Sequence, residues 1–342
     1  MLNKAIIDLA KLKRNALNVK ALIPEHTKFC AVVKADAYGH GAPAVASALY
    51  PLVDCFAVAL VEEGVELRLC GIDKEILVLT PVYPIDAQSI VRFDLTATVS
   101  SEKDVQALYY QAKAQGKTVS VHVKYNTGMN RQGVDDLKEL EQILLKARQS
   151  RLIKVDGIYS HFANPSDKKR RRAAENKFLL ANNLVKRYNN KAICHISASG
   201  GLLKGAYYDM VRVGILLYGY KPFPFKGVSV EPIMKVYAPV LQNRRVKKGE
   251  FALYGNKSAK EDLQFSLVRF GYADGLMRKN IRSIFNNRCM DVSAALNAKA
   301  QDGMALIMDD AEMLAKEYKT ISYEILTAAA KRAQKIYVST EE

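Results

Sequence analysis

A lysine at the end of a buried apolar segment is the first residue in this sequence whose type and position point to chemistry. Residues 29–33 are apolar, and Lys34 follows them at once. Burial lowers the pKa of a lysine, because a charged ammonium loses its hydration, and this leaves a nucleophilic neutral amine. Schiff-base chemistry requires such an amine. A single strand-end lysine can also be a structural residue whose ammonium reaches solvent. The residues around it must therefore distinguish a catalytic role from a structural one.

Further polar residues lie on or shortly after the apolar runs along the chain. They are Tyr38, Lys124, Arg131, His161, His195, Ser199 and Arg212, accompanied by Gly200, Gly201 and Gly214. Cations, hydroxyls and glycines together suit the binding of an anion, whereas carboxylates are few among them. Glycoside hydrolysis and metal coordination therefore fit this set poorly, because both depend on carboxylates.

Eight apolar runs must position these residues. They span 29–33, 56–60, 76–79, 95–99, 119–124, 155–159, 192–196 and 210–217. The runs are nearly continuous, as in parallel strands that are covered on both faces. Helical patterns lie between them, at 104–114, 135–148 and 173–188 among others. We predict an α/β protein with a (β/α)8 TIM-type barrel, whose chemistry lies at the carboxyl ends of the strands. The alternative is a doubly wound open sheet, but its GxGxxG motif is absent.

The character of the chain changes after Tyr220. Prolines stand at 222, 224 and 232, and short segments at 236–241, 251–254 and 265–270 alternate with turns. This pattern indicates a β-rich C-terminal domain. A helical piece at 323–331 and an apolar end at 336–338 close it. We predict a barrel at 8–222 and a β-rich domain at 223–342, which also includes residues 1–7.

Charge and cysteine content limit the kinds of binding partner and the cellular compartment that we expect. The 342 residues carry a net charge of +16, but the basic residues are scattered except at 168–172, which we interpret as the exposed start of a helix. We therefore predict no nucleic-acid partner. Five widely spaced cysteines without a CxxC motif indicate reduced thiols. We expect neither a signal peptide nor a membrane span, and hence a cytoplasmic protein.

The segment of residues 31–41, AVVKADAYGHG, resembles the cofactor-lysine signature of the alanine racemase family. The resemblance extends over nearly the whole chain. It implies a barrel plus a β domain, pyridoxal 5'-phosphate as cofactor, an amino acid as substrate and a head-to-tail homodimer with shared active sites.

The resemblance also implies roles in cofactor binding. Lys34 would bind the cofactor covalently, and its phosphate would be held by Tyr38, Ser199, Gly214, Ile215 and Tyr323. Arg212 would face the pyridine nitrogen. His161 would stand between Arg212 and the catalytic tyrosine in a hydrogen-bond chain, and His195 would support the site from behind.

Roles toward the substrate follow from the same resemblance. Racemisation needs a base on each face of a planar carbanion: Lys34 would be one, and Tyr254 of the partner subunit the other. Lys124 resembles the family's carbamylated lysine, whose negative charge would position Arg131 toward the substrate carboxylate. The remaining substrate residues would be Tyr272 at the entrance, Met290 and Asp291 across the dimer, and Ser322 with Tyr323 as a gate.

Two departures from the family pattern stand out. Asn126 occupies a position where the family more often has aspartate, and fewer residues than usual separate Tyr272 from Met290. The predicted function is the interconversion of L- and D-alanine, which supplies D-alanine for peptidoglycan. The alternatives are a racemase of broader specificity, a decarboxylase on the same barrel that would use Cys289, and a non-catalytic pyridoxal-phosphate-binding homologue.

Overall fold

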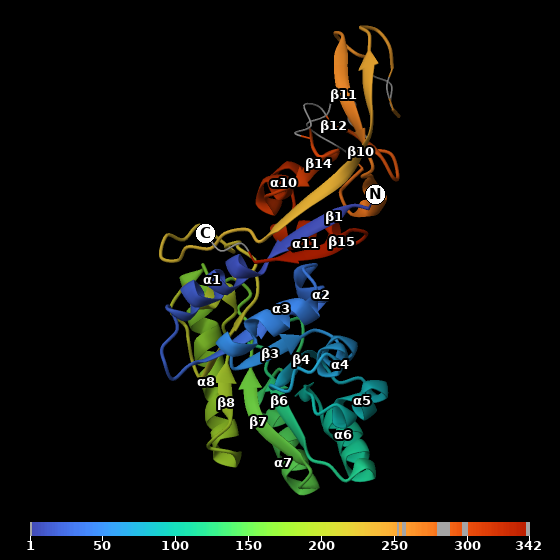
Figure 1. Ribbon diagram of the computed structural model, residues 1–342. Coiled ribbons are helices and arrows are strands. Elements are labelled where there is room, and N and C mark those ends of the chain that lie inside the picture. The colour runs from blue at the N-terminus through green and yellow to red at the C-terminus, as the bar shows by residue number, and fades with distance from the viewer. Residues whose placement is uncertain (1, 252, 255–257, 279–287, 296–299, 340–342) are drawn as a thin grey trace.

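Eight parallel strands form a closed barrel in the computed structural model, which describes residues 2–251, 253–254, 258–278, 288–295 and 300–339. They are β2 (Lys28–Val32), β3 (Cys55–Val58), β4 (Ile76–Pro81), β5 (Thr96–Val99), β6 (Val119–Lys124), β7 (Ile153–Tyr159), β8 (Ile193–His195) and β9 (Met210–Val213). The order is β8-β7-β6-β5-β4-β3-β2-β9, and a parallel bridge between Ala198 and Arg212 joins the two ends. The prediction of a barrel is confirmed (Figure 1).

Helices follow the strands and cover the barrel. They are α1 (Leu9–Lys20), α2 (Lys34–Tyr38), α3 (Ala42–Leu49), α4 (Val61–Leu69), α5 (Ala87–Arg92), α6 (Glu102–Gln115), α7 (Leu137–Ser150), α8 (Lys168–Tyr188) and α9 (Ser199–Leu202). Helix α8 begins five residues before the predicted start, because Asp167 caps it and accepts the Arg170 N–H at 3.0 Å. The basic run at 168–172 is thus its largely exposed first turn. Within the described residues, no helix is long and apolar enough to cross a membrane.

A second sheet forms the other domain. Its strands are β1 (Lys4–Asp8), β10 (Met234–Val246), β11 (Leu263–Val268), β12 (Ser293–Ala295), β13 (Ala300–Gln301), β14 (Met304–Met308) and β15 (Gln334–Val338), packed with α10 (Ala311–Tyr318) and α11 (Ser322–Ala329). The order is β12-β11-β10-β1-β15, with β14 also on β10. The β-rich prediction is confirmed, but the strand expected at 251–254 is not: Phe251 forms an isolated bridge with Ser258, and Ala252 lies outside the described residues. Helix α10 was not predicted.

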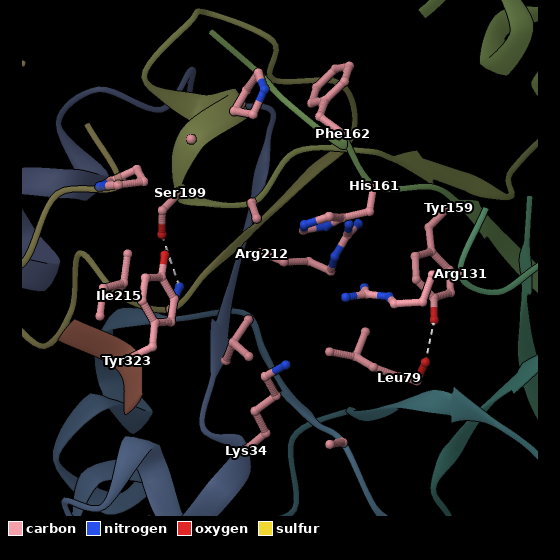
Figure 2. Close-up of a pocket in the computed structure, with 18 of the residues that line it drawn as sticks. Lys34, Leu79, Arg131, Tyr159, His161, Phe162, Ser199, Arg212, Ile215 and Tyr323 are labelled. Atoms are coloured by element: carbon pink, nitrogen blue, oxygen red, sulfur yellow. Dashed lines mark hydrogen bonds between the residues drawn. The ribbon is translucent and has the colours of Figure 1, made fainter. Parts of the chain in front are cut away.

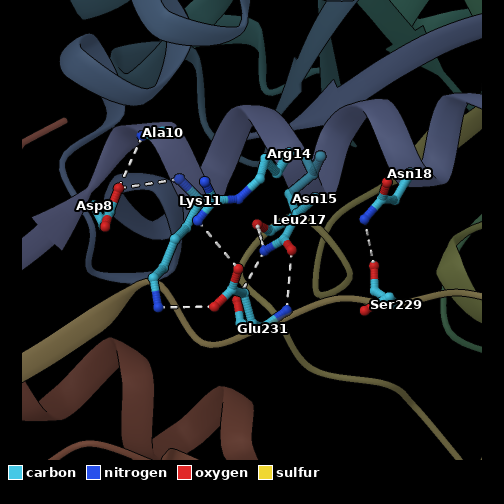
Figure 3. A network of polar contacts seen from close by, with 9 residues as sticks. All are labelled: Asp8, Ala10, Lys11, Arg14, Asn15, Asn18, Leu217, Ser229 and Glu231. Atoms are coloured by element: carbon cyan, nitrogen blue, oxygen red, sulfur yellow. Dashed lines mark hydrogen bonds and ion pairs between the residues drawn. The ribbon is translucent and has the colours of Figure 1, made fainter. Parts of the chain in front are cut away.

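A polar network fixes the chain where it passes from the barrel to the second sheet (Figure 3). The buried Asn15 of α1 donates to the carbonyls of Leu217 at 3.1 Å and Glu231 at 2.9 Å, and accepts the Glu231 N–H at 3.0 Å. The Glu231 carboxylate also pairs with Lys11 at 2.8 Å. Because α1 follows β1 directly, these contacts hold the second sheet in place against the barrel.

Candidate active site

A pocket of about 560 Å³ opens at the carboxyl ends of the barrel strands (Figure 2). The predicted residues that line it are Lys34, Tyr38, Lys124, Arg131, His161, Ser199, Arg212, Gly214, Ile215 and Tyr323. They come from strand ends far apart in the sequence, and Tyr323 comes from α11 of the second domain. Tyr254, Tyr272, Met290 and Asp291 are not among the lining residues.

The turn that carries Lys34 is left-handed. Residues 35–38 have φ between 51° and 55°, a conformation that costs an L-residue roughly 1–2 kcal/mol. Contacts around the turn offset this cost: Asp36 accepts the Ala42 N–H at 2.8 Å and pairs with Lys335 at 2.6 Å, and Glu63 accepts the Ala35 N–H at 2.6 Å. The backbone therefore turns sharply after β2, and the Lys34 amine points into the pocket (Figure 2).

Burial lowers the pKa of Lys34 from its ordinary value, and the positive charge of Arg131 lowers it further. The carboxylate of Glu63 acts in the opposite direction, as the smallest of the three effects. A lowered pKa makes the neutral amine accessible, and that form is the nucleophile and the base. The environment of Lys34 therefore suits it for carbonyl chemistry.

Glycine at position 39 lets the second domain reach the pocket. Gly39 has φ +83°, and a Cβ there would lie 2.4 Å from the Leu326 carbonyl oxygen of α11. This close approach brings Tyr323 toward Tyr38, with ring centroids 5.9 Å apart. Burial raises the pKa of both phenols, that of Tyr323 to about 12, so both stay protonated and can donate hydrogen bonds at neutral pH.

An anion cradle lies in the same pocket as Lys34. The Ser199 hydroxyl accepts the Gly214 N–H at 3.3 Å, and a Cβ at Gly214 would lie 2.4 Å from the Tyr38 hydroxyl. A Cβ at Gly201 would lie 2.5 Å from Ser197 Oγ. Only glycines allow this approach, which gathers hydroxyl and backbone N–H donors where barrels commonly bind phosphate.

Arg212 is buried in the pocket wall. Its Nη2 donates to the Ser160 carbonyl at 2.6 Å, and its Nη1 contacts His195 Nδ1. Burial lowers its pKa to about 10, so it stays charged at neutral pH. The imidazole that hydrogen-bonds to Arg212 belongs to His195, and the chain expected from Arg212 through His161 to the catalytic tyrosine stays a prediction. His161 lines the pocket, and burial followed by the charge of Arg212 lowers its pKa, which keeps it neutral.

Two residues that support the site were missed from the sequence. His122 Nδ1 lies 2.9 Å from His195 Nε2, and the Tyr159 ring stacks on His195 with centroids 5.0 Å apart and planes at 2°. The Tyr159 hydroxyl donates to the Leu79 carbonyl at 2.9 Å. A signal existed, because His122 stands two residues before Lys124 and so shares its face of the strand.

Positive charge dominates this end of the pocket. Lys124 Nζ lies 4.1 Å from the centroid of the Tyr159 ring. Burial lowers the pKa of Lys124 well below its ordinary value, and the charges of Arg212 and Arg131 lower it further. The described lining contains no aspartate or glutamate. The site is therefore built to receive negative charge from outside the chain.

The residues expected to act across a dimer, and Tyr272 expected at the entrance, lie on the surface of the second domain. Tyr254 is 67% exposed, Met290 55% and Tyr272 37%. The Met290 carbonyl accepts the Ala273 N–H at 2.9 Å, and Asp291 pairs with Arg332. Gly255, which follows Tyr254, and most of the shortened stretch between Tyr272 and Met290 (residues 279–287) lie outside the described residues.

Comparison with known proteins gives one answer for both domains. Residues 7–222 match the N-terminal domain of alanine racemase, and residues 233–337 match its C-terminal domain. Alanine racemase of Aquifex aeolicus is 32% identical over 98% of this chain and 99% of its own. The solved alanine racemase of Clostridium difficile 630 superposes with a TM-score of 0.92 at 29% identity, over 99% of this chain and 96% of that one. The fold is also that of the alanine racemase from Bartonella henselae solved with covalently bound pyridoxal phosphate, at TM-score 0.83 and 24% identity, over 99% of this chain and 100% of that one. The chain belongs to the alanine racemase family.

Proposed function

We propose that this enzyme interconverts L- and D-alanine by a two-base mechanism, with Lys34 as one base and Tyr254 of the partner subunit as the other, and that it supplies D-alanine for peptidoglycan. The observation that carries the proposal is Lys34 itself. Its amine has a lowered pKa and points into a pocket that also contains an anion cradle. The names of the relatives support alanine as the substrate.

The donor set of the pocket fits pyridoxal 5'-phosphate. The cradle of Ser199, Gly214 and Tyr38 would hold its phosphate, Lys34 would bind its aldehyde carbon, and Arg212 would face its ring nitrogen. An arginine donates hydrogen bonds and does not give up its proton at neutral pH, so it would leave that nitrogen unprotonated. When bound, the cofactor supplies an electron sink for the negative charge that develops on the substrate Cα.

Lys34 and Tyr254 would then move the proton. The neutral Lys34 amine accepts it on one face of the substrate, and the phenol of Tyr254 donates one on the other face. The exposure of Tyr254, at 67%, and its place outside the pocket of its own chain support a role in a second subunit. We accordingly propose a homodimer with shared active sites, in which Met290 and Asp291 also face the partner and Tyr272 lies at the entrance.

Lys124 would supply the negative charge that the pocket lacks. Its lowered pKa makes the neutral amine accessible, and that form reacts with carbon dioxide to give a carbamate and release a proton to solvent. A carbamate beside Arg131 would place a negative charge next to the guanidinium and form an ion pair with it. Arg131 would then be held in place to bind the substrate carboxylate.

Location and domain division complete the proposal. All five cysteines are free, which supports a reducing compartment such as the cytoplasm. We place the boundary between the barrel and the second domain at residues 222 and 223, with residues 1–7 in the latter. The participation of β1 in the second sheet supports this division.

The test is to incubate the purified holoenzyme with L-alanine and to follow D-alanine by chiral separation. Wild type should form D-alanine, Lys34→Ala should form none and should lose the visible absorption of the bound cofactor, and Tyr254→Phe should keep the cofactor but slow the reaction. A holoenzyme that leaves L-alanine unchanged but racemises a larger amino acid would contradict the substrate and favour the broader racemase.

A further inference from the structure

Arg332 bridges two carboxylates in the part of the second domain that carries Met290 and Asp291. Its Nη1 lies 2.9 Å from Asp291 Oδ1, and its Nε lies 3.6 Å from Asp274 Oδ1. The side chain of Asp291 is 59% exposed and that of Asp274 only 5%. One arginine therefore connects a carboxylate on the surface to one that is fixed inside the domain.

Asp274 is fixed by its own contacts. It accepts the Asn3 side-chain amide at 3.1 Å and the Gly271 N–H at 2.8 Å. The backbone after Gly271 lies directly on the Met290 segment, because a Cβ at Gly271 would come within 2.1 Å of the Met290 carbonyl oxygen. Two further N–H groups, of Tyr272 and Ala273, bond to the carbonyls of Cys289 and Met290. These backbone hydrogen bonds thus fix the main chain at Met290. The ion pair with Arg332 fixes the side chain of Asp291 and offsets its negative charge.

That charge matters for an amino-acid substrate. An unpaired Asp291 carboxylate would repel a substrate carboxylate, whereas one paired with a cation would not. We propose that Arg332 is a positioning residue that acts in trans: it holds Asp291 and offsets its charge so that this segment can face the substrate carboxylate in the partner subunit's site. This inference rests on the proposed function, in which Met290 and Asp291 serve the partner.

Lys335 provides an internal contrast. It stands three residues after Arg332 and pairs with Asp36 at 2.6 Å, in the left-handed turn that carries Lys34. Its contact therefore lies beside the site of its own subunit. Two neighbouring cations on one short stretch of chain should act on two different active sites.

Heterodimers separate the two effects. Two differently tagged chains are co-expressed and purified through both tags, and one chain carries Lys34→Ala. The single working site then takes Lys34 from the other chain and Tyr254, Met290 and Asp291 from the Lys34→Ala chain. Arg332→Ala is placed either on the Lys34→Ala chain, in trans to the working lysine, or on the chain that keeps Lys34, in cis. Lys331→Ala, a change at an exposed neighbour, serves as the matched control.

In trans, Arg332→Ala should raise KM for alanine about threefold to fivefold, the size expected for a partly exposed ion pair. It should leave kcat and the cofactor absorption nearly unchanged, and Arg332→Lys should restore part of the KM. In cis, Arg332→Ala should have no effect. Lys335→Ala should show the reverse pattern, with its effect in cis. A general structural defect would instead lower kcat and cofactor content in both arrangements.

Tyr254→Phe in the same heterodimers tests the proposed function separately. If Tyr254→Phe slows the reaction only in trans while Arg332→Ala has no effect there, the inference is overturned and the proposed function stands. If Tyr254→Phe acts in cis, the partner-supplied site is wrong, and the role of Arg332 falls with it.

Discussion

His122 Nδ1 and His195 Nε2 lie 2.9 Å apart inside the barrel, and the other nitrogen of His195 contacts Arg212. Because arginine only donates, His195 Nδ1 has to accept. The proton of His195 is then on Nε2 and is donated to His122. Both rings are neutral, since burial lowers the pKa of each, that of His122 to about 3. Arg212 is therefore oriented by a chain of two neutral histidines.

The first prediction concerns pH. His122 and His40 have folded-state pKa values of about 3 and about 4, lowered by burial, whereas in the unfolded chain they protonate as the pH falls through about 6.5. The unfolded state then binds more protons, so the free energy of unfolding should fall between pH 6.5 and 4, by roughly 2 kcal/mol per histidine at pH 5. Urea unfolding at pH 7 and pH 5, at one protein concentration, measures this.

His122→Phe should reduce that pH dependence. His26→Asn is the control, because His26 is exposed and its replacement should leave the pH dependence of the free energy of unfolding unchanged. If His122→Phe keeps the same pH dependence of the free energy of unfolding, His122 is not neutral in the folded protein.

The second prediction concerns the space for His122. A Cβ at Gly157 would lie 2.7 Å from the His122 ring, so Gly157→Ala should displace that ring, destabilise the protein by about 1–3 kcal/mol and slow racemisation through Arg212. Denaturant unfolding and initial rates measure the two effects. In the double variant Gly157→Ala with His122→Ala, the cost of Gly157→Ala on stability should largely disappear. Full additivity would mean that the added methyl group acts elsewhere.

The third prediction concerns the junction of the two domains. Gly39→Ala should destabilise the protein by more than about 1 kcal/mol and weaken cofactor binding, because the Cβ meets Leu326 of α11 and moves Tyr323 away. Gly116→Ala is a matched control: its φ is also positive, at +63°, but nothing lies within 4 Å of its Cβ. Thermal unfolding and cofactor titration compare the two. Equal losses of stability and cofactor affinity in the two variants would show that backbone strain alone explains the effect of Gly39→Ala.

The fourth prediction concerns Lys124. Protein equilibrated with ¹³C-bicarbonate should show a carbamate carbon resonance, which should be lost in Lys124→Ala and retained in Lys154→Ala, a change at an exposed residue of β7. Because the reaction needs the neutral amine, the signal should increase as the pH rises through the lowered pKa of Lys124. A signal that survives Lys124→Ala would assign the carbamate to another lysine.

Part of the site was predictable because it depends on position along single strands. The rule that chemistry follows strand ends selected Lys34 and Ser199, and both line the pocket. The same rule passed over Tyr159, which is the last residue of its strand rather than the first one after it. It also passed over His122, which lies inside its strand.

The sequence by itself determined the eight strands and the domain type, because strands that are buried on both faces appear in the sequence as continuous apolar runs. Only the tertiary structure decided that Arg212 contacts His195, that Tyr159 stacks on His195, and that Arg332 joins Asp274 to Asp291. These contacts join residues from different elements. The distances between these residues depend on barrel closure, strand register and the packing of the two sheets. No local sequence pattern specifies these three features.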